Sequence, residues 1–172
     1  EIVEDVKKNG GQAILTKNEH KTGTDRIYEV FQKIDTSNID LVMNLQGDEP
    51  LINIDDIKNL NKQMIKNTSQ LGTLASNIQD KALLENSNVV KVLTKQNLNQ
   101  INFPEAENFM RNTYQEKENI YHHIGIYCYT KNTLEKFVSY NQSANEIKNK
   151  LEQLRALDNK IKINVAFAKF AP

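Results

Sequence analysis

The segment Leu41-Val-Met-Asn-Leu-Gln-Gly-Asp-Glu-Pro50 says most about how this chain folds. Its apolar start predicts a buried strand, and Gly47 followed by Asp48 predicts a tight turn at the strand's carboxyl end. Ligands of open α/β sheets bind at that end. A carboxylate there can hold Mg²⁺ beside a nucleotide phosphate. The alternative is an ordinary turn, because Gly-Asp and Glu-Pro are both turn dipeptides.

Predicted strands and helices alternate on both sides of this segment. This order predicts an α/β layered sheet with right-handed crossovers, and it directs attention to the loops after Leu15 and Leu45. No prediction is made for 96–119, where the apolar pattern is weak. The predicted strands are 12–15, 41–46, 71–78, 89–93, 124–129 and 161–170, and the predicted helices are 1–9, 27–34, 54–65, 81–86, 134–138 and 146–157.

Composition limits the partners and the compartment. The 172 residues are enough for one domain, and the formal net charge is zero, with 22 basic and 22 acidic side chains. A neutral chain lacks the basic surplus that nucleic acids or anionic membranes attract, so we expect neither partner. A single cysteine, Cys128, cannot form a disulfide within the chain, which predicts a cytoplasmic location.

His20-Lys-Thr-Gly-Thr-Asp-Arg26 runs from a loop into a predicted helix. Backbone N–H groups at a helix start suit an anion or the edge of a base. A purely structural alternative is a helix N-cap, with Thr24 as the capping residue and Asp25 complementing the helix dipole.

Tyr121-His-His-Ile-Gly-Ile-Tyr127 is a predicted strand with a polar face. Residues two apart share a face, so His123, Gly125 and Tyr127 lie on one side, opposite Ile124 and Ile126. That face is a candidate sugar-binding surface, and a half-exposed strand with a packed histidine is the alternative. Neighbouring strand residues point opposite ways, so the His122–His123 pair is a poor metal site.

Leu151-Glu-Gln-Leu-Arg155 lies on the predicted helix 146–157. Glu152 and Gln153 offer hydrogen-bond donors and acceptors at adjacent positions. A solvated helix face is the alternative.

Taken together and in this order, the segments resemble the 3-deoxy-manno-octulosonate (Kdo) cytidylyltransferases. The resemblance covers nearly the whole chain. The Gln-Gly-Asp-Glu-Pro segment is shared with related sugar nucleotidyltransferases, whereas the segments at 123–127 and 152–155 are typical of the Kdo branch. The segments that carry the resemblance are His20-Lys-Thr-Gly-Thr-Asp-Arg26, Asn44-Leu-Gln-Gly-Asp-Glu-Pro50, Asn88-Val-Val-Lys-Val92, His123-Ile-Gly-Ile-Tyr127 and Leu151-Glu-Gln-Leu-Arg155.

The resemblance implies a Rossmann-like, GT-A-like nucleotidyltransferase fold, a three-layer sandwich in which about 95–145 forms a small dimerisation and sugar-binding subdomain. It implies a homodimer that converts CTP and Kdo into CMP-Kdo and pyrophosphate, a step towards lipopolysaccharide. Asp48 would be the catalytic residue and the Mg²⁺ ligand. The residues implied for CTP are His20, Thr22, Gly23 and Arg26, and those implied for Kdo are Gln46, Arg111, His123, Tyr127, Glu152 and Gln153.

Two features of the family have no counterpart in the chain. Family members open with a strand and a phosphate-cradling loop, and they continue to a second metal-binding Asp. The chain begins at Glu1, inside a predicted helix, and ends at Pro172. We therefore expect a single domain that is incomplete at both ends and has little activity by itself.

Three other functions stay open from the sequence. A sister enzyme would activate another acid sugar, such as a sialic acid. A glycosyltransferase would show Asp-x-Asp at the strand end, where this chain has Asp48-Glu49-Pro50. A non-catalytic paralogue would bind nucleotide or a partner without turnover.

Overall fold

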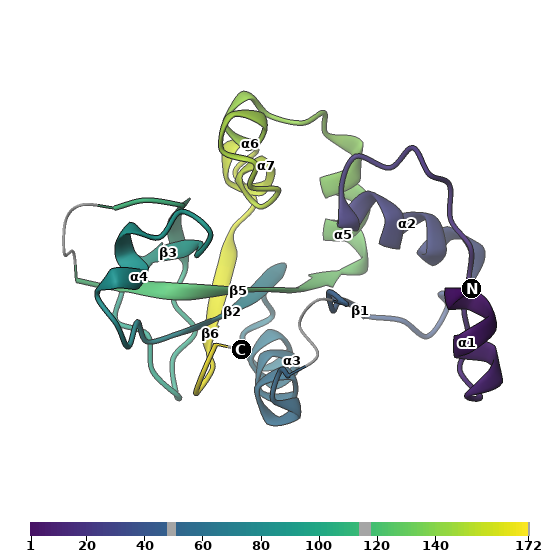
Figure 1. Ribbon diagram of the computed structural model, residues 1–172, viewed down its shortest axis with the longest axis horizontal. Helices are drawn as coiled ribbons and strands as arrows, with labels where there is room; N and C mark the ends of the chain where they lie inside the picture. The colour runs from purple at the N-terminus through teal and green to yellow at the C-terminus, as the bar shows by residue number, and fades with distance from the viewer. Residues whose placement is uncertain (48–50, 114–117, 172) are drawn as a thin grey trace.

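A mixed sheet with helices on both faces forms the body of the molecule in a computed structural model, which describes residues 1–47, 51–113 and 118–171 (Figure 1). The strands are β1 (Leu41–Asn44), β2 (Leu71–Ser76), β3 (Lys91–Thr94), β4 (Ala106–Met110), β5 (Ile120–Thr130) and β6 (Ile163–Phe167). The helices are α1 (Ile2–Lys8), α2 (Gly23–Lys33), α3 (Ile54–Asn67), α4 (Ala82–Glu85), α5 (Lys131–Ser139), α6 (Ala144–Asn149) and α7 (Leu154–Asp158).

The long strand β5 organises the sheet. The strand order is β4-β3-β5-β2-β6, and β1 also pairs with β5. β5 runs antiparallel to β1, β2 and β3, whereas β2 and β6 are parallel. β1, β2 and β6 therefore point the same way. The prediction of an α/β sheet is confirmed, with the addition that its central strand is antiparallel to its neighbours.

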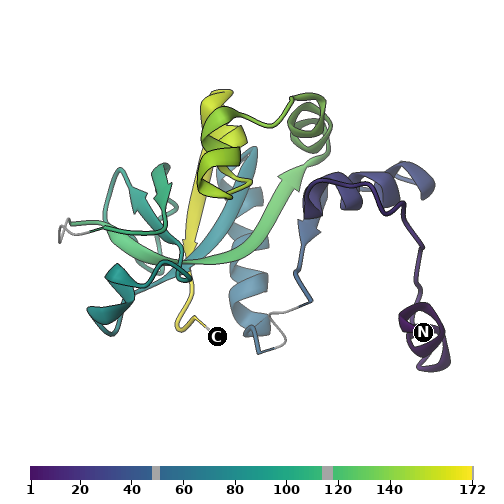
Figure 2. The same cartoon turned by 45° about the horizontal axis from the view of Figure 1, so that its top comes forward.

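Each face of the sheet buries its own apolar core. On the α3 side, Leu60 and Met64 pack with Ile124 and Ile126 of β5. On the other side, Phe31, Phe137 and Leu154 belong to the core that includes Tyr127. Figure 2 shows α3 on one side of the strands and α5, α6 and α7 on the other. The predicted division of β5 into two faces is confirmed, because its alternate side chains enter different cores.

One predicted strand is wrong. Residues 12–15 have no regular structure, and the side chains of Ile14 and Leu15 are 41% and 78% exposed. A strand needs a neighbour to satisfy its backbone groups, and no described strand pairs with this segment. The helix α1 before it is confirmed, although none of its residues is buried.

The predicted helix 146–157 is two helices. Lys150 interrupts it in the left-handed conformation with φ 53°, so that α6 and α7 are separate. The predicted apolar face is wrong at Ile147, which is 60% exposed, whereas Leu151 and Leu154 are buried. The break brings Glu152 and Gln153 to the wall of a cavity instead of a continuous helix face.

Two smaller points complete the fold. The segment 96–119, for which no prediction is made above, contains β4. The N-cap of α2 is Thr22 and not Thr24, which lies inside the helix and is fully buried. No helix in the described part of the chain is long and apolar enough to cross a bilayer.

Candidate functional site

A cavity of about 330 Å³ lies where β5 passes the 150–153 segment. Residues from five parts of the chain surround it, and they include every residue predicted from the sequence to bind the sugar. The lining residues are Gln46, Asn88, Val90, Arg111, His122, His123, Gly125, Tyr127, Lys150, Leu151, Glu152 and Gln153.

Gly125 makes room for Gln46 in this cavity. A Cβ atom built on Gly125 would lie 3.3 Å from Nε2 of Gln46, closer than an ordinary contact. The missing side chain therefore lets the amide of Gln46 lie against the strand between His123 and Tyr127.

His123 is held in the neutral form. Its ring is buried, Nε2 lies 2.9 Å from the hydroxyl of Thr73, and Phe109 packs edge-on at 5.0 Å. Burial, with a smaller contribution from His122, lowers the pKa of His123 to about 3. Burial also raises the pKa of Tyr127 well above its ordinary value, so the phenol keeps its proton.

Arg111 joins two loops at the edge of the cavity. Its guanidinium donates to the carbonyls of Ser87, Asn149 and Lys150 at 3.1, 2.9 and 3.0 Å. A guanidinium has about five N–H donors, so the bonds to described residues leave about two of them for a ligand. The fully buried Lys91 holds the backbone of Arg111, because its ammonium donates to the carbonyl of Arg111 at 2.6 Å.

Glu152 is an acid in a cavity with basic residues. Its Oε1 is buried and has no hydrogen-bond partner among the described residues. Burial raises the pKa of the carboxyl group, and the nearby Arg155 and the hydroxyl of Thr24 lower it by less. Glu152 is therefore more readily protonated than an ordinary glutamate. Gln153, the residue before α7, is buried beside it.

Arg155 connects this wall to α2. Its side chain is 2% exposed and makes a two-pronged contact with Glu146, while Nη1 lies 3.3 Å from the carboxylate of Asp25. The guanidinium also lies over the ring of Phe137 at 4.6 Å. One buried cation thus connects the segment implied for the nucleotide to α6.

The residues predicted for CTP lie outside this cavity. His20 pairs with Glu29 and lines a separate cavity of about 280 Å³. Arg26 holds the 16–17 loop through the carbonyl of Lys17 at 3.0 Å. Thr22 caps α2, and Gly23 approaches Asn44 of β1. The structure therefore brings the predicted sugar residues together around one cavity, whereas none of the predicted nucleotide residues lines it.

Asp48, the predicted catalytic residue and metal ligand, lies outside the described residues. Among the residues that are described, no three His, Cys, Asp or Glu side chains are placed to hold a metal ion. Mg²⁺ is commonly held by one or two carboxylates and the phosphates of a substrate, so it does not require such a cluster.

Sequence reasoning missed several residues of the cavity. Asn88 and Val90 belong to a segment that carried the resemblance, but no role was assigned to them. His122 was considered only with His123, as a poor metal site, and no role was assigned to it. Lys150 had no sequence signal, because only the break between α6 and α7 brings it to the wall.

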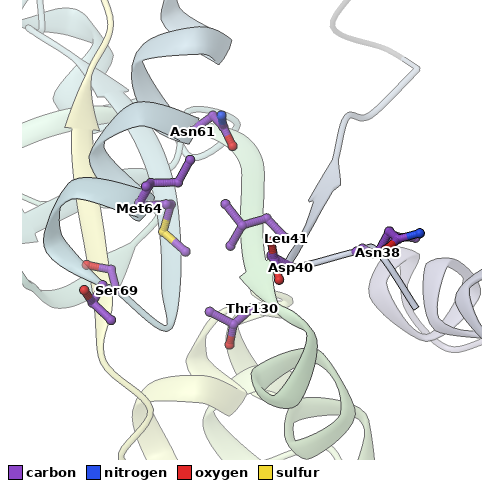
Figure 3. Close-up of a pocket in the computed structure, with 10 residues that line it drawn as sticks. Asn38, Asp40, Leu41, Asn61, Met64, Ser69 and Thr130 are labelled. Atoms are coloured by element: carbon purple, nitrogen blue, oxygen red, sulfur yellow. The ribbon is translucent and has the colours of Figure 1, made fainter. Parts of the chain in front are cut away.

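A second, more apolar hollow of about 690 Å³ lies between β1 and α3 (Figure 3). It is bordered by Leu41 and Met64, with Thr130 at one side. None of the residues predicted from the sequence to bind CTP or the sugar lines it.

Curated relatives and solved structures resemble the chain over nearly its whole length. The 3-deoxy-manno-octulosonate cytidylyltransferases of Bartonella tribocorum and Brucella canis are 37% and 38% identical to the chain, over all of it and over 71% and 69% of their own lengths. A solved structure of CMP:2-keto-3-deoxy-manno-octonic acid synthetase complexed with CTP superimposes with a TM-score of 0.84 at 31% identity, covering 98% of this chain and 68% of that one.

More distant structures share the fold alone. Apo-UDP-glucose pyrophosphorylase matches with a TM-score of 0.63 at 15% identity, over 97% of this chain and 59% of its own.

The family model described as cytidylyltransferase matches residues 1–163. The chain therefore belongs to the cytidylyltransferase family.

Proposed function

We propose that this cytidylyltransferase transfers CMP from CTP to Kdo. The oxygen of the anomeric hydroxyl of Kdo forms a bond to the α-phosphorus, the bond from that phosphorus to the bridging oxygen breaks, and pyrophosphate leaves. The hydroxyl proton is lost in the same process. The products are CMP-Kdo and pyrophosphate.

One observation carries the proposal. The residues chosen for the sugar from the sequence alone come from separate segments of the chain, yet all of them line the same cavity: Gln46, Arg111, His123, Tyr127, Glu152 and Gln153. The amide, imidazole, phenol and carboxyl groups of this set give many hydrogen-bonding positions. A hydroxyl-rich ligand satisfies such groups, and each one left unpaired on burial costs about 1–3 kcal/mol.

The charges around the cavity favour an acidic sugar. Arg111 and Lys150 line it, and Lys91 lies directly behind Arg111. Glu152, the one acid among the described lining residues, has a raised pKa and so resists ionisation. The wall therefore attracts a carboxylate although the chain as a whole carries no net charge.

CTP would bind beside the sugar, along the segment that contains His20, Thr22, Gly23 and Arg26. The relative that was solved with CTP shares the fold over nearly all of this chain, which supports this assignment. Arg155 joins α2 to α6, because it contacts both Asp25 and Glu146, and it lies two residues after Gln153 of the sugar cavity. It would keep the two substrates in a fixed relative orientation.

Mg²⁺ belongs to the same proposal. Asp48 would hold it with the CTP phosphates, and the bound ion would neutralise charge on those phosphates. A homodimer formed through about 95–145 is also proposed on the basis of the family resemblance.

A substrate-competition assay tests the function. The full-length protein is given CTP with Kdo, with N-acetylneuraminate or with neither, and pyrophosphate release is measured. Release that depends on Kdo supports the proposal. Release only with N-acetylneuraminate would assign the chain to the sister activity, and tight nucleotide binding without release would identify a non-catalytic protein.

A further inference from the structure

The hydroxyl of Thr73 on β2 lies at the centre of a small buried network. Its oxygen is 2.7 Å from the carbonyl oxygen of Ile126, 3.3 Å from that of Ile124 and 2.9 Å from Nε2 of His123. Thr73 has no exposed surface. The proton positions in this network therefore depend on these groups alone.

The contact with Ile126 decides where the hydroxyl proton lies. A carbonyl oxygen can only accept, and two oxygens 2.7 Å apart repel one another unless a proton lies between them. The hydroxyl of Thr73 therefore donates to Ile126. Because this hydroxyl has a single proton, it can only accept from His123, so Nε2 of the imidazole carries the hydrogen.

The other ring nitrogen is then an acceptor. None of the described residues makes a hydrogen bond to Nδ1 of His123, although the residue lines the sugar cavity. The ring is kept in place by Phe109 at 5.0 Å and Tyr127 at 5.6 Å. A neutral imidazole with its proton fixed on Nε2 offers a ligand a lone pair and no charge.

We propose that Thr73 is a positioning residue, which holds His123 as the Nε2–H tautomer so that Nδ1 accepts a hydrogen bond from a hydroxyl group of the bound sugar. The proposal rests on the proposed function, since it assumes a sugar in this cavity. It gives Thr73 a role that its position inside the sheet does not suggest.

This arrangement would also select which part of the ligand faces β5. A carboxylate has no proton to donate and would repel a lone pair on Nδ1. A hydroxyl can donate to Nδ1 and still accept from Arg111 or Lys150, which can only donate. The carboxylate of an acid sugar would therefore face the cations, with a hydroxyl at His123.

Nitrogen NMR of the full-length protein tests the tautomer without any ligand. The ¹⁵N shifts of an imidazole distinguish a protonated from an unprotonated nitrogen, and Gln substitutions at His20 and His122 assign the signals. We expect Nε2 of His123 to be protonated at pH 7 and Nδ1 to be free. Protonation of Nδ1 instead of Nε2 would overturn the proposal.

Two variants then test the connection to the ligand. Thr73→Val keeps the shape but removes the hydroxyl, whereas Thr73→Ser keeps the hydroxyl. We expect Thr73→Val to lose the tautomer preference and to bind Kdo about tenfold more weakly by calorimetry, and Thr73→Ser to stay within about twofold of the wild type. The affinity for CTP should not change in either variant.

The outcomes separate the two proposals. Equal loss of Kdo affinity in both variants, or a lost tautomer preference in Thr73→Val with unchanged affinity, contradicts the role of Thr73. A wild-type protein that binds neither Kdo nor N-acetylneuraminate contradicts the proposed function instead, and the NMR measurement still decides the tautomer. If Thr73→Val does not fold, the wild-type spectrum and the Thr73→Ser titration remain decisive.

Discussion

The guanidinium of Arg155 donates two hydrogen bonds to the carboxylate of Glu146, with N–O distances of 2.9 and 2.7 Å. Both side chains are nearly inaccessible, at 2% and 3% exposure. Glu146 is also the N3 residue of a capping box with Ser143, so one carboxylate both caps the start of α6 and pairs with α7. The third guanidinium nitrogen of Arg155 donates to the carboxylate of Asp25.

Breaking this pair should destabilise the fold. Arg155→Met leaves Glu146 buried without a counter-charge, which typically costs about 3–5 kcal/mol. We expect the double variant Arg155→Met/Glu146→Gln to be more stable than Arg155→Met, because it removes the uncompensated charge. Urea unfolding at pH 7 measures both. A double variant no more stable than Arg155→Met would contradict this account.

Removing only the contact between Arg155 and Asp25 of α2 should affect Kdo binding more than the stability of the fold. Asp25→Asn leaves the Arg155–Glu146 contact intact, so we expect the free energy of unfolding to fall by about 1 kcal/mol or less. We expect Kdo affinity to fall as well, although Asp25 does not line the sugar cavity.

Glu105→Gln is the matched control for Asp25→Asn. Asp25 and Glu105 are 23% and 25% exposed, and each pairs with a cation, but Glu105 pairs with Lys95, away from the cavity. We expect Glu105→Gln to leave Kdo affinity unchanged. Equal loss of affinity in both variants would show a general effect of charge and not a connection through Arg155.

Two glycines in neighbouring strands should respond differently to alanine. In Gly125→Ala the new methyl group meets the end of the Gln46 side chain at 3.3 Å, so we expect about a tenfold loss of Kdo affinity with little change in stability. In Gly72→Ala it meets Sδ of Met64 at 2.6 Å and Leu60 at 2.9 Å inside the α3 core. That overpacking should cost about 1–3 kcal/mol. Calorimetry and urea unfolding on both variants check the contrast.

Arg111 should be sensitive to geometry as well as charge. Lysine keeps the charge of Arg111 but cannot reach the carbonyls of Ser87, Asn149 and Lys150 together. We expect Arg111→Lys to weaken Kdo binding nearly as much as Arg111→Met does. Lys95→Gln, which removes a cation outside the cavity, serves as the control. Full retention of affinity by Arg111→Lys would show that only charge matters.

The stability of the protein should fall in mild acid because of His123. Its pKa is about 3 in the folded state and 6.5 in the reference state, so only the unfolded chain binds this proton between those values. The contribution of His123 to the free energy of unfolding is therefore complete above pH 6.5. Below that pH it falls by about 1.4 kcal/mol per pH unit, until pH about 3. Urea unfolding at pH 7 and pH 5 should show a smaller loss in His123→Gln than in the wild type. An equal loss in both proteins would assign the acid sensitivity to other groups.

How far the sequence predicts this protein depends on the range of the interactions involved. The strand at 41–44 and the helices at 54–67 and 131–139 follow local apolar periodicity, and the structure confirms them. The alternation of His123, Gly125 and Tyr127 with Ile124 and Ile126 is equally local, because it depends only on the geometry of a strand. The candidate sugar residues also came from short local motifs, through their resemblance to the Kdo cytidylyltransferases.

The failures share a different cause. Residues 12–15 have the composition of a strand, but strand formation requires a partner, and none pairs with them in the described part of the fold. The helix 146–157 has continuous helical periodicity, yet burial of Arg155 against Glu146, Asp25 and Phe137 accompanies a break at Lys150. Both outcomes depend on contacts between residues distant in the chain, which a local pattern does not contain.

The sequence alone determined where most elements lie, because that follows from apolar periodicity, and its short motifs resembled a family whose site residues they implied. Tertiary structure alone decided that Gln46, Arg111, His123 and Glu152 meet around one cavity, that Lys150 joins them, and that the proton of His123 lies on Nε2. Those results depend on burial and on distances between atoms more than forty residues apart, such as Thr73 and His123. Such distances are set only when the whole sheet has formed.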